Sequence, residues 1–321
     1  QIKGVGEEAG DALVDGRGTG YGRVGEIRKR ARLGPGVLDE MKKEMPDRFY
    51  MEGVSEQAVI GIAAGLAMEG FIPYVNTIAT FITRRCYEQV AVDLCLHNLP
   101  VRLIANGGGL VYAPLGPTHL ATEDIAIMRA LPNMTVVAPA DAEEMRRFMD
   151  KTLDWKRPIY IRLGKGGDPV VTDPKDGFEI GRAQVLRQPG TVLMISTGVM
   201  TGRALEAAEA LSGDGIDCGV VHAPTVKPLD EGAVLAAARE ASLVVTLEEH
   251  TLIGGLGSAV TDLFADNLDL DNGGPKVLRL GIPDAFPAEY GSQDSMLETF
   301  GLQPPAIADA VRGAVSSTAG A

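Results

Sequence analysis

Aromatic residues, cysteines and long apolar runs are all scarce in this sequence, and each shortage argues against a class of protein. Phe, Trp and Tyr make up 5% of the 321 residues, and the net charge is −13. No cluster of Lys and Arg is interleaved with aromatic residues, as it would be on a typical nucleic-acid-binding surface. The basic run 28–32 is better explained as a solvated helix face or an anion contact. We therefore expect no nucleic acid as a partner.

The three cysteines, Cys86, Cys95 and Cys218, have no metal-ligand spacing and lie within apolar helical or strand patterns, so we expect buried, reduced thiols. No apolar run is long enough to span a membrane. The N-terminus has no positively charged lead before an apolar stretch, and the chain begins with Gln1 rather than Met, which suggests that it is trimmed. We expect a cytoplasmic protein with no membrane contact.

The rest of the composition, with 45% hydrophobic and 23% charged residues, is that of an ordinary globular protein, and the length favours two α/β domains. Helical and extended patterns alternate through both halves, which predicts two doubly wound domains with mainly parallel sheets. The segment 165–189 is rich in Gly, Asp and Pro and has no sustained period. We place the domain boundary within it and assign residues 1–175 and 176–321 to the two domains.

The same patterns locate the individual elements. Strands are predicted at 71–76, 101–105, 135–138, 158–162, 191–197, 218–222, 242–247 and 276–280. Helices are predicted at 55–68, 84–97, 122–130, 142–153, 202–211, 231–239 and 255–264. The first fifty residues are less regular, with a glycine-rich stretch at 16–22 that indicates a flexible loop, and they contain no clear first strand.

The segment 47–57 leads directly into the apolar stretch 58–67, which predicts a buried helix with Glu56 in its first turn. For an isolated acid, the helix macrodipole alone would explain that position. However, G-V-S-E-Q before an Ala/Gly-rich helix resembles the pyrimidine-binding domain of the transketolase family. There the glutamate binds N1′ of the aminopyrimidine of thiamine diphosphate and promotes formation of the reactive carbanion. The resemblance implies a catalytic and cofactor-binding role for Glu56, with Val54 beside it in the cofactor site.

The segment 76–89 resembles the strand-to-helix segment of the same family, whose aromatic residue stacks on the aminopyrimidine. Phe81 matches that aromatic residue, although a Phe that ends a strand usually belongs to the core. Tyr87 is assigned to the cofactor site by the same resemblance. Arg84 and Arg85 are candidates for substrate contact, because related synthases have an anion-binding Arg nearby, at a spacing that differs by one residue.

G-P-T-H at 116–119 resembles a family loop in which the histidine contacts substrate oxygens and helps to move protons. A lone loop histidine is usually structural or at the surface, but the run 123–134 continues the resemblance. It implies a catalytic and substrate-binding role for His119. It also implies that Arg162, in P-I-Y-I-R, binds the substrate phosphate, for which a bidentate guanidinium is suited.

The resemblance extends from about residue 47 to residue 315, but the loop 106–116 departs from the family pattern. The family's substrate-binding Asp is Leu115 here, its Glu is Pro114, and its phosphate-contacting His is Gly107. Apolar or absent side chains thus replace the hydrogen-bond partners of sugar hydroxyls. We expect an altered donor or acceptor specificity.

The family's metal and diphosphate motif, G-D-G followed farther along by N-N, is also missing. Gly213-Asp214-Gly215 follows an Ala/Leu-rich helix without an Asn pair at the required distance, so it is interpreted as a helix-terminating turn. This chain then supplies no metal ligands. Mg²⁺ and the diphosphate would be held by a partner subunit resembling the family's N-terminal half, and we expect an α2β2 heterotetramer with sites at the interfaces.

The implied reaction, in carbohydrate metabolism, transfers a two-carbon ketol unit from a ketose or ketose phosphate to an aldehyde. Two other enzymes share the glutamate and both domains: a 1-deoxy-D-xylulose-5-phosphate synthase-like subunit and a beta-type subunit of a 2-oxo acid dehydrogenase. A noncatalytic scaffold that kept the fold is a further alternative. The run G-P-T-H-L-A-T-E-D-I-A favours transketolase. His222 and His250 are interpreted as structural.

Overall fold

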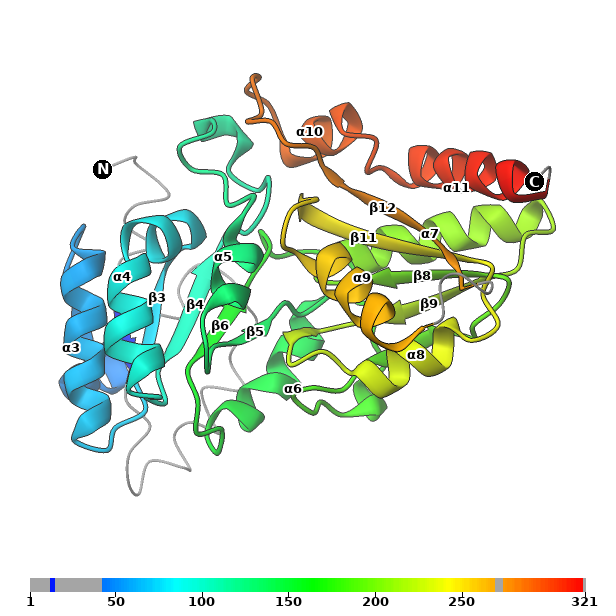
Figure 1. Cartoon of the computed structure of the whole chain (residues 1–321). Coiled ribbons are helices and arrows are strands. Elements are labelled where there is room, and N and C mark those ends of the chain that lie inside the picture. Colours follow the sequence, from blue (N-terminus) through cyan, green and yellow to red (C-terminus); the bar gives the residue numbers. More distant parts are fainter. Residues whose placement is uncertain (1–11, 15–41, 269–273, 320–321) are drawn as a thin grey trace.

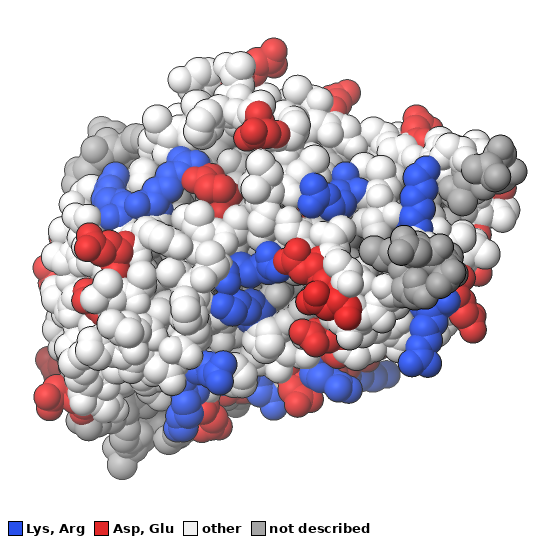
Figure 2. Space-filling model, viewed as in Figure 1, with Lys and Arg blue, Asp and Glu red and all other residues white. Residues whose placement is uncertain are grey.

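The computed structural model describes residues 12–14, 42–268 and 274–319, and it contains two α/β units (Figure 1). Each unit is built on one mainly parallel sheet with helices against its faces, so the predicted fold class is confirmed. On the face drawn in Figure 2, Lys and Arg side chains alternate with Asp and Glu, and neither sign forms a broad patch. Within the described residues, no helix has the length and apolarity required to cross a membrane.

The first sheet has seven strands in the order β10-β5-β6-β4-β3-β1-β2. These are β1 (Ala12–Val14), β2 (Phe49–Met51), β3 (Tyr74–Ile78), β4 (Arg102–Asn106), β5 (Thr135–Val137), β6 (Ile159–Arg162) and β10 (Thr225–Lys227). β3, β4, β6 and β5 are parallel and largely buried, as their nearly continuous apolar sequences require. Their carboxyl ends therefore meet at one edge of the sheet, which is where open α/β sheets bind ligands.

The helices of the first unit follow the predicted order. They are α3 (Glu56–Met68), the π-helix η2 (Phe81–Arg85), α4 (Tyr87–Gln89), the π-helix η3 (Val90–Leu96), α5 (Asp124–Ala130) and α6 (Ala142–Thr152). A π-helical turn holds one residue more than an α-helical turn, so η2 accommodates an extra residue directly after the sheet. Phe81 was expected near the end of a strand. Instead, β3 ends at Ile78 and Phe81 is the first residue of η2.

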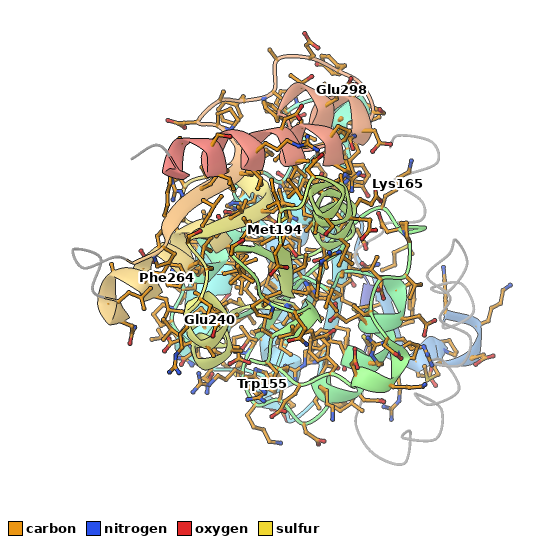
Figure 3. All side chains as sticks on the ribbon, turned by 90° about the vertical axis from the view of Figure 1, so that its right-hand side faces the viewer. Trp155, Lys165, Met194, Glu240, Phe264 and Glu298 are labelled. Atoms are coloured by element: carbon orange, nitrogen blue, oxygen red, sulfur yellow. The ribbon has the colours of Figure 1, made fainter. Side chains whose placement is uncertain are left out.

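The second sheet has five strands in the order β12-β11-β8-β9-β7. They are β7 (Gln184–Arg187), β8 (Val192–Ser196), β9 (Cys218–His222), β11 (Leu243–Thr251) and β12 (Lys276–Ile282), and the helices are α7 (Met200–Gly213), α8 (Glu231–Ala238), α9 (Leu256–Asn267), α10 (Gln293–Thr299) and α11 (Pro304–Ala319). α7 and α11 cover one face, and α8 and α9 cover the other (Figure 1). Met194, labelled in Figure 3, is a fully buried residue of the central strand β8.

Several elements were not predicted from the sequence. The expectation that the first fifty residues contain no clear strand is wrong, because β1 pairs antiparallel with both β3 and β2. β7, β10, α10 and α11 were also missed, and β10 joins the first sheet although it lies beyond the predicted boundary. The proposed loop 16–22 and the basic run 28–32 lie outside the described residues. The three cysteines are buried and free, as predicted, and burial raises the pKa of Cys95 to about 11 and of Cys218 to about 12.

The loop between β4 and α5 joins the two units. Leu110, Ala113 and Leu120 leave the first sheet and pack into the core of the second unit, against residues of β8, α7 and α11. A connection that buries its apolar side chains in a neighbouring core has little freedom to move. The G-P-T-H loop is therefore positioned by both units.

Candidate active site

Glu56 lies at the start of α3, where the backbone N–H groups of the first turn favour a carboxylate. Its side chain is only 4% exposed, and such a buried charge requires a partner. Arg85 provides it, because its Nη1 lies 2.6 Å from Oε2 of Glu56. Gln57, the next residue of the helix, donates from Nε2 to the backbone oxygen of Arg85 at 3.0 Å. Glu56 thus binds the guanidinium of Arg85, and Gln57 binds its backbone oxygen.

Phe81 and His119 complete this group. The guanidinium carbon of Arg85 lies 4.5 Å from the centre of the Phe81 ring, within the range of a cation–π contact. The ring of His119 meets that of Phe81 edge-on, with centroids 5.2 Å apart and an interplanar angle of 68°. The structure therefore brings together Glu56, Phe81 and His119, predicted from three separate motifs. We refer to Glu56, Phe81, Arg85 and His119 as the Glu56 cluster.

The surroundings of His119 favour its neutral form. Burial and the neighbouring positive charge of Arg85 both lower its pKa, in that order of size. Its Nδ1 lies 2.9 Å from Oγ1 of Thr118, a hydrogen bond that orients the ring. A neutral imidazole has one nitrogen that accepts a proton and one that donates, as a residue that moves protons at a substrate oxygen requires.

The other predicted cofactor residues lie at the margin of the cluster. Val54 precedes α3 and is 81% exposed. The hydroxyl of Tyr87 donates to the backbone oxygen of Ile127 in α5, at 3.2 Å. Neither residue makes a described contact with Glu56 or Phe81 in the part of the chain that the structure covers, so their cofactor roles stay predictions.

Arg84 points away from Glu56. It forms an ion pair with Glu123, whose Oε2 lies 2.7 Å from Nη2, and it donates to the backbone oxygen of Pro117 at 3.4 Å. Arg84 thus links η2 to the G-P-T-H loop at a partly exposed position. A direct substrate contact of Arg84 stays a prediction.

Arg162 belongs to a buried network at the end of β6. Its Nε donates to Oδ2 of Asp124 at 2.8 Å, and its Nη2 donates to the backbone oxygen of Glu249 at 2.7 Å. The hydroxyl of Tyr160 donates to the same Asp124 oxygen at 2.7 Å. Burial alone would lower the pKa of Arg162, but the charge of Asp124 raises it above the ordinary value. We call Asp124, Tyr160, Arg162 and Glu249 the Arg162 network.

The Arg162 network lies directly beneath the glycines 107–109, which begin the loop between β4 and α5. A Cβ at Gly108 would come within 2.6 Å of Cγ of Arg162, and one at Gly109 within 2.5 Å of Cδ of Glu249. Oε1 of Glu249 accepts from the backbone N–H of Leu110 and from Nε2 of Gln293, both at 2.9 Å. This geometry gives Arg162 a role in supporting the loop. The predicted phosphate contact of Arg162 stays a prediction.

The residues that replace the family's polar groups have different surroundings. Gly107 adopts φ +70°, and a Cβ there would meet Cε2 of Tyr112 at 2.1 Å. The ring of Tyr112 therefore fills the space that a histidine at position 107 would need. Pro114 is exposed and Leu115 is partly exposed, both in the short 3₁₀ helix 113–115. The altered positions thus lie partly at the surface of the loop.

The remaining predicted structural residues occupy structural positions. His222 bridges Oε2 of Glu144 and Oγ1 of Thr201, each at 2.8 Å, so it links α6 of the first unit to α7 of the second. His250 accepts from the backbone N–H of Ala126 and is fully buried. The G-D-G turn ends α7 at Gly213, and Asp214 is its C-cap residue, as predicted. Among the described residues, no group of three or more His, Cys, Asp or Glu side chains could hold a metal ion.

Two family models match this chain. The transketolase pyrimidine-binding domain matches residues 9–167, and the transketolase C-terminal domain matches residues 181–307. An uncharacterised transketolase family protein of Sinorhizobium fredii, y4mN, is 43% identical over 82% of this chain and 75% of its own length. The chain belongs to the transketolase family. This family is thiamine diphosphate dependent, and the two units correspond to its pyrimidine-binding and C-terminal domains.

Other family members resemble the chain at similar levels. SqwH of Clostridium, named as a 6-deoxy-6-sulfo-D-fructose transketolase subunit, is 38% identical over 83% of this chain and 80% of its own length. A 1-deoxy-D-xylulose-5-phosphate synthase of Synechococcus is 39% identical over 88% of this chain but 43% of its own length. The chain thus spans less than half of that synthase.

Solved structures support the same assignment. A split gene transketolase described as an inactive beta4 tetramer matches with a TM-score of 0.78 and 37% identity, covering 89% of this chain and 90% of the other. A transketolase of Pichia stipitis matches with a TM-score of 0.67 over 82% of this chain and 37% of its own. At 21% identity, that second match shows the fold alone.

Proposed function

We propose that this chain is the C-terminal-half subunit of a thiamine-diphosphate-dependent transketolase that moves a two-carbon ketol unit from a ketose or ketose phosphate to an aldehyde. The observation that carries the proposal is the meeting of the Glu56 carboxylate, the Phe81 ring and neutral His119 at one edge of the sheet. A buried carboxylate beside an aromatic face suits a flat heterocycle that carries N–H groups. The planar, N–H-bearing guanidinium of Arg85 already contacts both.

The cofactor, when bound, would supply the nucleophilic carbanion. Glu56 would accept a hydrogen bond from the ring nitrogen of the aminopyrimidine and stabilise its protonated form. Phe81 would orient the ring by stacking. His119 would hold or accept a proton at a substrate oxygen, for which its lowered pKa keeps it deprotonated near neutral pH.

The diphosphate and its Mg²⁺ need a second subunit, which we propose to be a transketolase N-terminal-half protein in an α2β2 heterotetramer. The described residues include no cluster that could hold a metal ion. In addition, the helix α3, which begins at the candidate site, presents the exposed apolar side chains of Ile62 and Met68, and the exposed Val54 precedes it. In the covered part of the chain, a Cβ at Gly61 or Gly65 would meet nothing within 4 Å. A continuous apolar helix face of this kind favours contact with another protein surface.

A second candidate is a subunit of a 1-deoxy-D-xylulose-5-phosphate synthase, which the 39% identity to the Synechococcus enzyme favours. The loop 106–116, where Leu115, Pro114 and Gly107 replace polar residues, leaves either substrate class open. The two reactions differ in one product, because ketol transfer from a ketose releases no carbon dioxide.

The deciding experiment reconstitutes the chain with a transketolase N-terminal-half subunit, with Mg²⁺ and thiamine diphosphate. We expect a ketose and an aldehyde to be converted without carbon dioxide. Carbon dioxide release from a 2-oxo acid together with joining of the remaining fragment to an aldehyde would establish the synthase instead, and carbon dioxide release without that joining would indicate a 2-oxo acid dehydrogenase subunit. Full activity of the chain alone would overturn the split-subunit proposal. A complex that assembles and binds no cofactor would indicate a scaffold.

A further inference from the structure

Arg85 lies where the proposed function needs the aminopyrimidine to lie, and the present inference rests on that function. Its guanidinium bonds to the carboxylate of Glu56 at 2.6 Å and covers the ring of Phe81 at 4.5 Å. A hydrogen bond to Glu56 and a stack on Phe81 are the two contacts assigned above to the cofactor. One face of a phenyl ring cannot stack on two planar groups at once.

The position of Arg85 follows from the local backbone. The π-helical turn η2 begins at Phe81 and ends at Arg85, and the wider turn places the two side chains over one another. Gln57 holds the backbone oxygen of Arg85 against α3, so the side chain starts beside Glu56. Arg84, one residue earlier, is directed to Glu123 instead.

The contact can also be opened at little cost to the core. The side chain of Arg85 is 41% exposed, whereas that of Glu56 is 4% exposed. An arginine that is half in solvent can exchange its partner for water, but the buried carboxylate needs some partner at all times. Arg85 therefore satisfies Glu56 until another N–H-bearing group takes its place.

We propose that Arg85 is a built-in occupant of the pyrimidine site, which closes the site in the free chain and is displaced when the aminopyrimidine binds. Occupancy by Arg85 then lowers the apparent affinity for the cofactor by the fraction of molecules that are open. The opposite arrangement, in which Arg85 stays in place and holds the cofactor, predicts the opposite effect of removing it.

The test titrates the full chain with 4-amino-5-hydroxymethyl-2-methylpyrimidine, the pyrimidine half of thiamine, which needs neither metal nor diphosphate contacts. Binding is followed by NMR for the wild type, Arg85→Ala, Arg85→Lys and the control Arg146→Ala, which removes a similarly exposed arginine that pairs with Glu143 in α6. Circular dichroism and thermal melting confirm that each variant is folded. We expect Arg85→Ala to bind the fragment more tightly by about tenfold, as for a site that is about nine-tenths occupied by its own side chain. Arg146→Ala should bind like the wild type.

The affinity of Arg85→Lys for the fragment should lie between those of the wild type and Arg85→Ala, because a lysine keeps the charge but loses the planar group that covers Phe81. Unchanged or weaker fragment binding by Arg85→Ala overturns the inference, and so does an absence of binding in every variant. Thiamine diphosphate binding by the reconstituted wild-type complex distinguishes failure of the Arg85 inference from failure of the proposed function. If the complex binds the cofactor, only the role of Arg85 has failed, and if it does not, the proposed function has failed as well.

Discussion

The Glu56 cluster and the Arg162 network both lie at the carboxyl edge of the first sheet, but they are built in different ways. Glu56 has a single ionic partner among the described residues, the partly exposed Arg85, beside the exposed apolar face of α3. Arg162 is buried among Asp124 of α5, Tyr160 of its own strand β6 and the backbone of Glu249 in β11, so its partners come from both units. In the Glu56 cluster, the carboxylate of Glu56 can exchange Arg85 for another partner. The Arg162 network is a fixed support on which the loop 106–116 rests.

This difference separates two kinds of charged residue that look alike in sequence. A buried charge whose partners are all internal gains nothing from a ligand, and removing one partner leaves another charge uncompensated. A buried charge whose partner lies partly in solvent is a place where a ligand can compete.

Glu56→Gln should slow proton exchange at C2 of thiamine diphosphate by roughly 10²–10⁴-fold in the reconstituted complex, as expected for loss of a proton-transfer partner. The side chains are nearly isosteric, so assembly and thermal stability should change little. The measurement is hydrogen–deuterium exchange at C2 at equal cofactor saturation, with Glu123→Gln as the control. Equal exchange in Glu56→Gln and wild type would mean that Glu56 is only a favourable acid in the first turn of α3.

Arg162→Met should lower the free energy of unfolding by about 3–5 kcal/mol, because the carboxylate of Asp124 is left buried without its ionic partner. Arg84→Met is the matched control, since its pair with Glu123 is partly exposed, and it should cost about 0–1 kcal/mol. Urea unfolding of both variants measures the difference. A stable Arg162→Met variant that fails only in binding a phosphorylated substrate would support the direct phosphate contact predicted from the sequence.

Glu56 and Arg162 also show which parts of the site can be predicted from the sequence. Glu56 could be predicted because its motif is local, and the helix that follows the motif fixes its position. Phe81 and His119 belong to motifs that follow the neighbouring strands β3 and β4. The partners of Arg162 could not be predicted, because Asp124 and Glu249 are 38 and 87 positions away in the chain and only the packing of both units brings them together. The same reason explains the missed pairing of β1 with β3.

Arg85 is an intermediate case. The sequence marked it as a candidate for substrate contact, but its contact with Glu56 depends on the extra residue in the π-helical turn η2. Periodicity analysis assumes 3.6 residues per turn and therefore cannot place a side chain after such a turn. The one-residue difference in spacing from the related synthases was the available signal, and its structural meaning became clear only from the backbone.

Gly107→His, which restores the family's residue, should destabilise the protein by about 1–3 kcal/mol, because its Cβ would overlap the ring of Tyr112. Gly107 also has φ +70°, so the control must share the backbone strain without the overlap. Gly167→His does so, since Gly167 has φ +81° and nothing lies within 4 Å of its added Cβ. Similar melting temperatures for the two variants would show that Tyr112 moves aside freely.

Leu115→Asp should improve kcat/KM for ordinary ketose phosphates by about tenfold in the reconstituted enzyme, which corresponds to one regained hydrogen bond to a sugar hydroxyl. Leu115 is partly exposed, so the new carboxylate should not disturb the core. Steady-state kinetics with several ketose donors measures the change. An unaltered donor preference would indicate that this part of the loop does not contact the substrate.

The smallest expected effect is a shift in the titration of His119, and it links the proposed proton-moving residue to Arg85, the proposed occupant of the pyrimidine site. Burial and the charge of Arg85 lower the pKa of His119 below 6.5. The unfolded chain therefore takes up a proton at higher pH than the folded chain. Stability contributed by this group is present above the unfolded pKa and is lost as the pH falls through the window between the two values.

Arg85→Ala should raise the pKa of His119 toward its ordinary value without reaching it, because burial remains as the larger cause. NMR titration of the His119 imidazole in the full chain, compared with Arg84→Ala, tests this without cofactor or partner. If the two variants titrate alike, Arg85 does not lie close to His119 in solution, and the Glu56 cluster is more open than its geometry indicates.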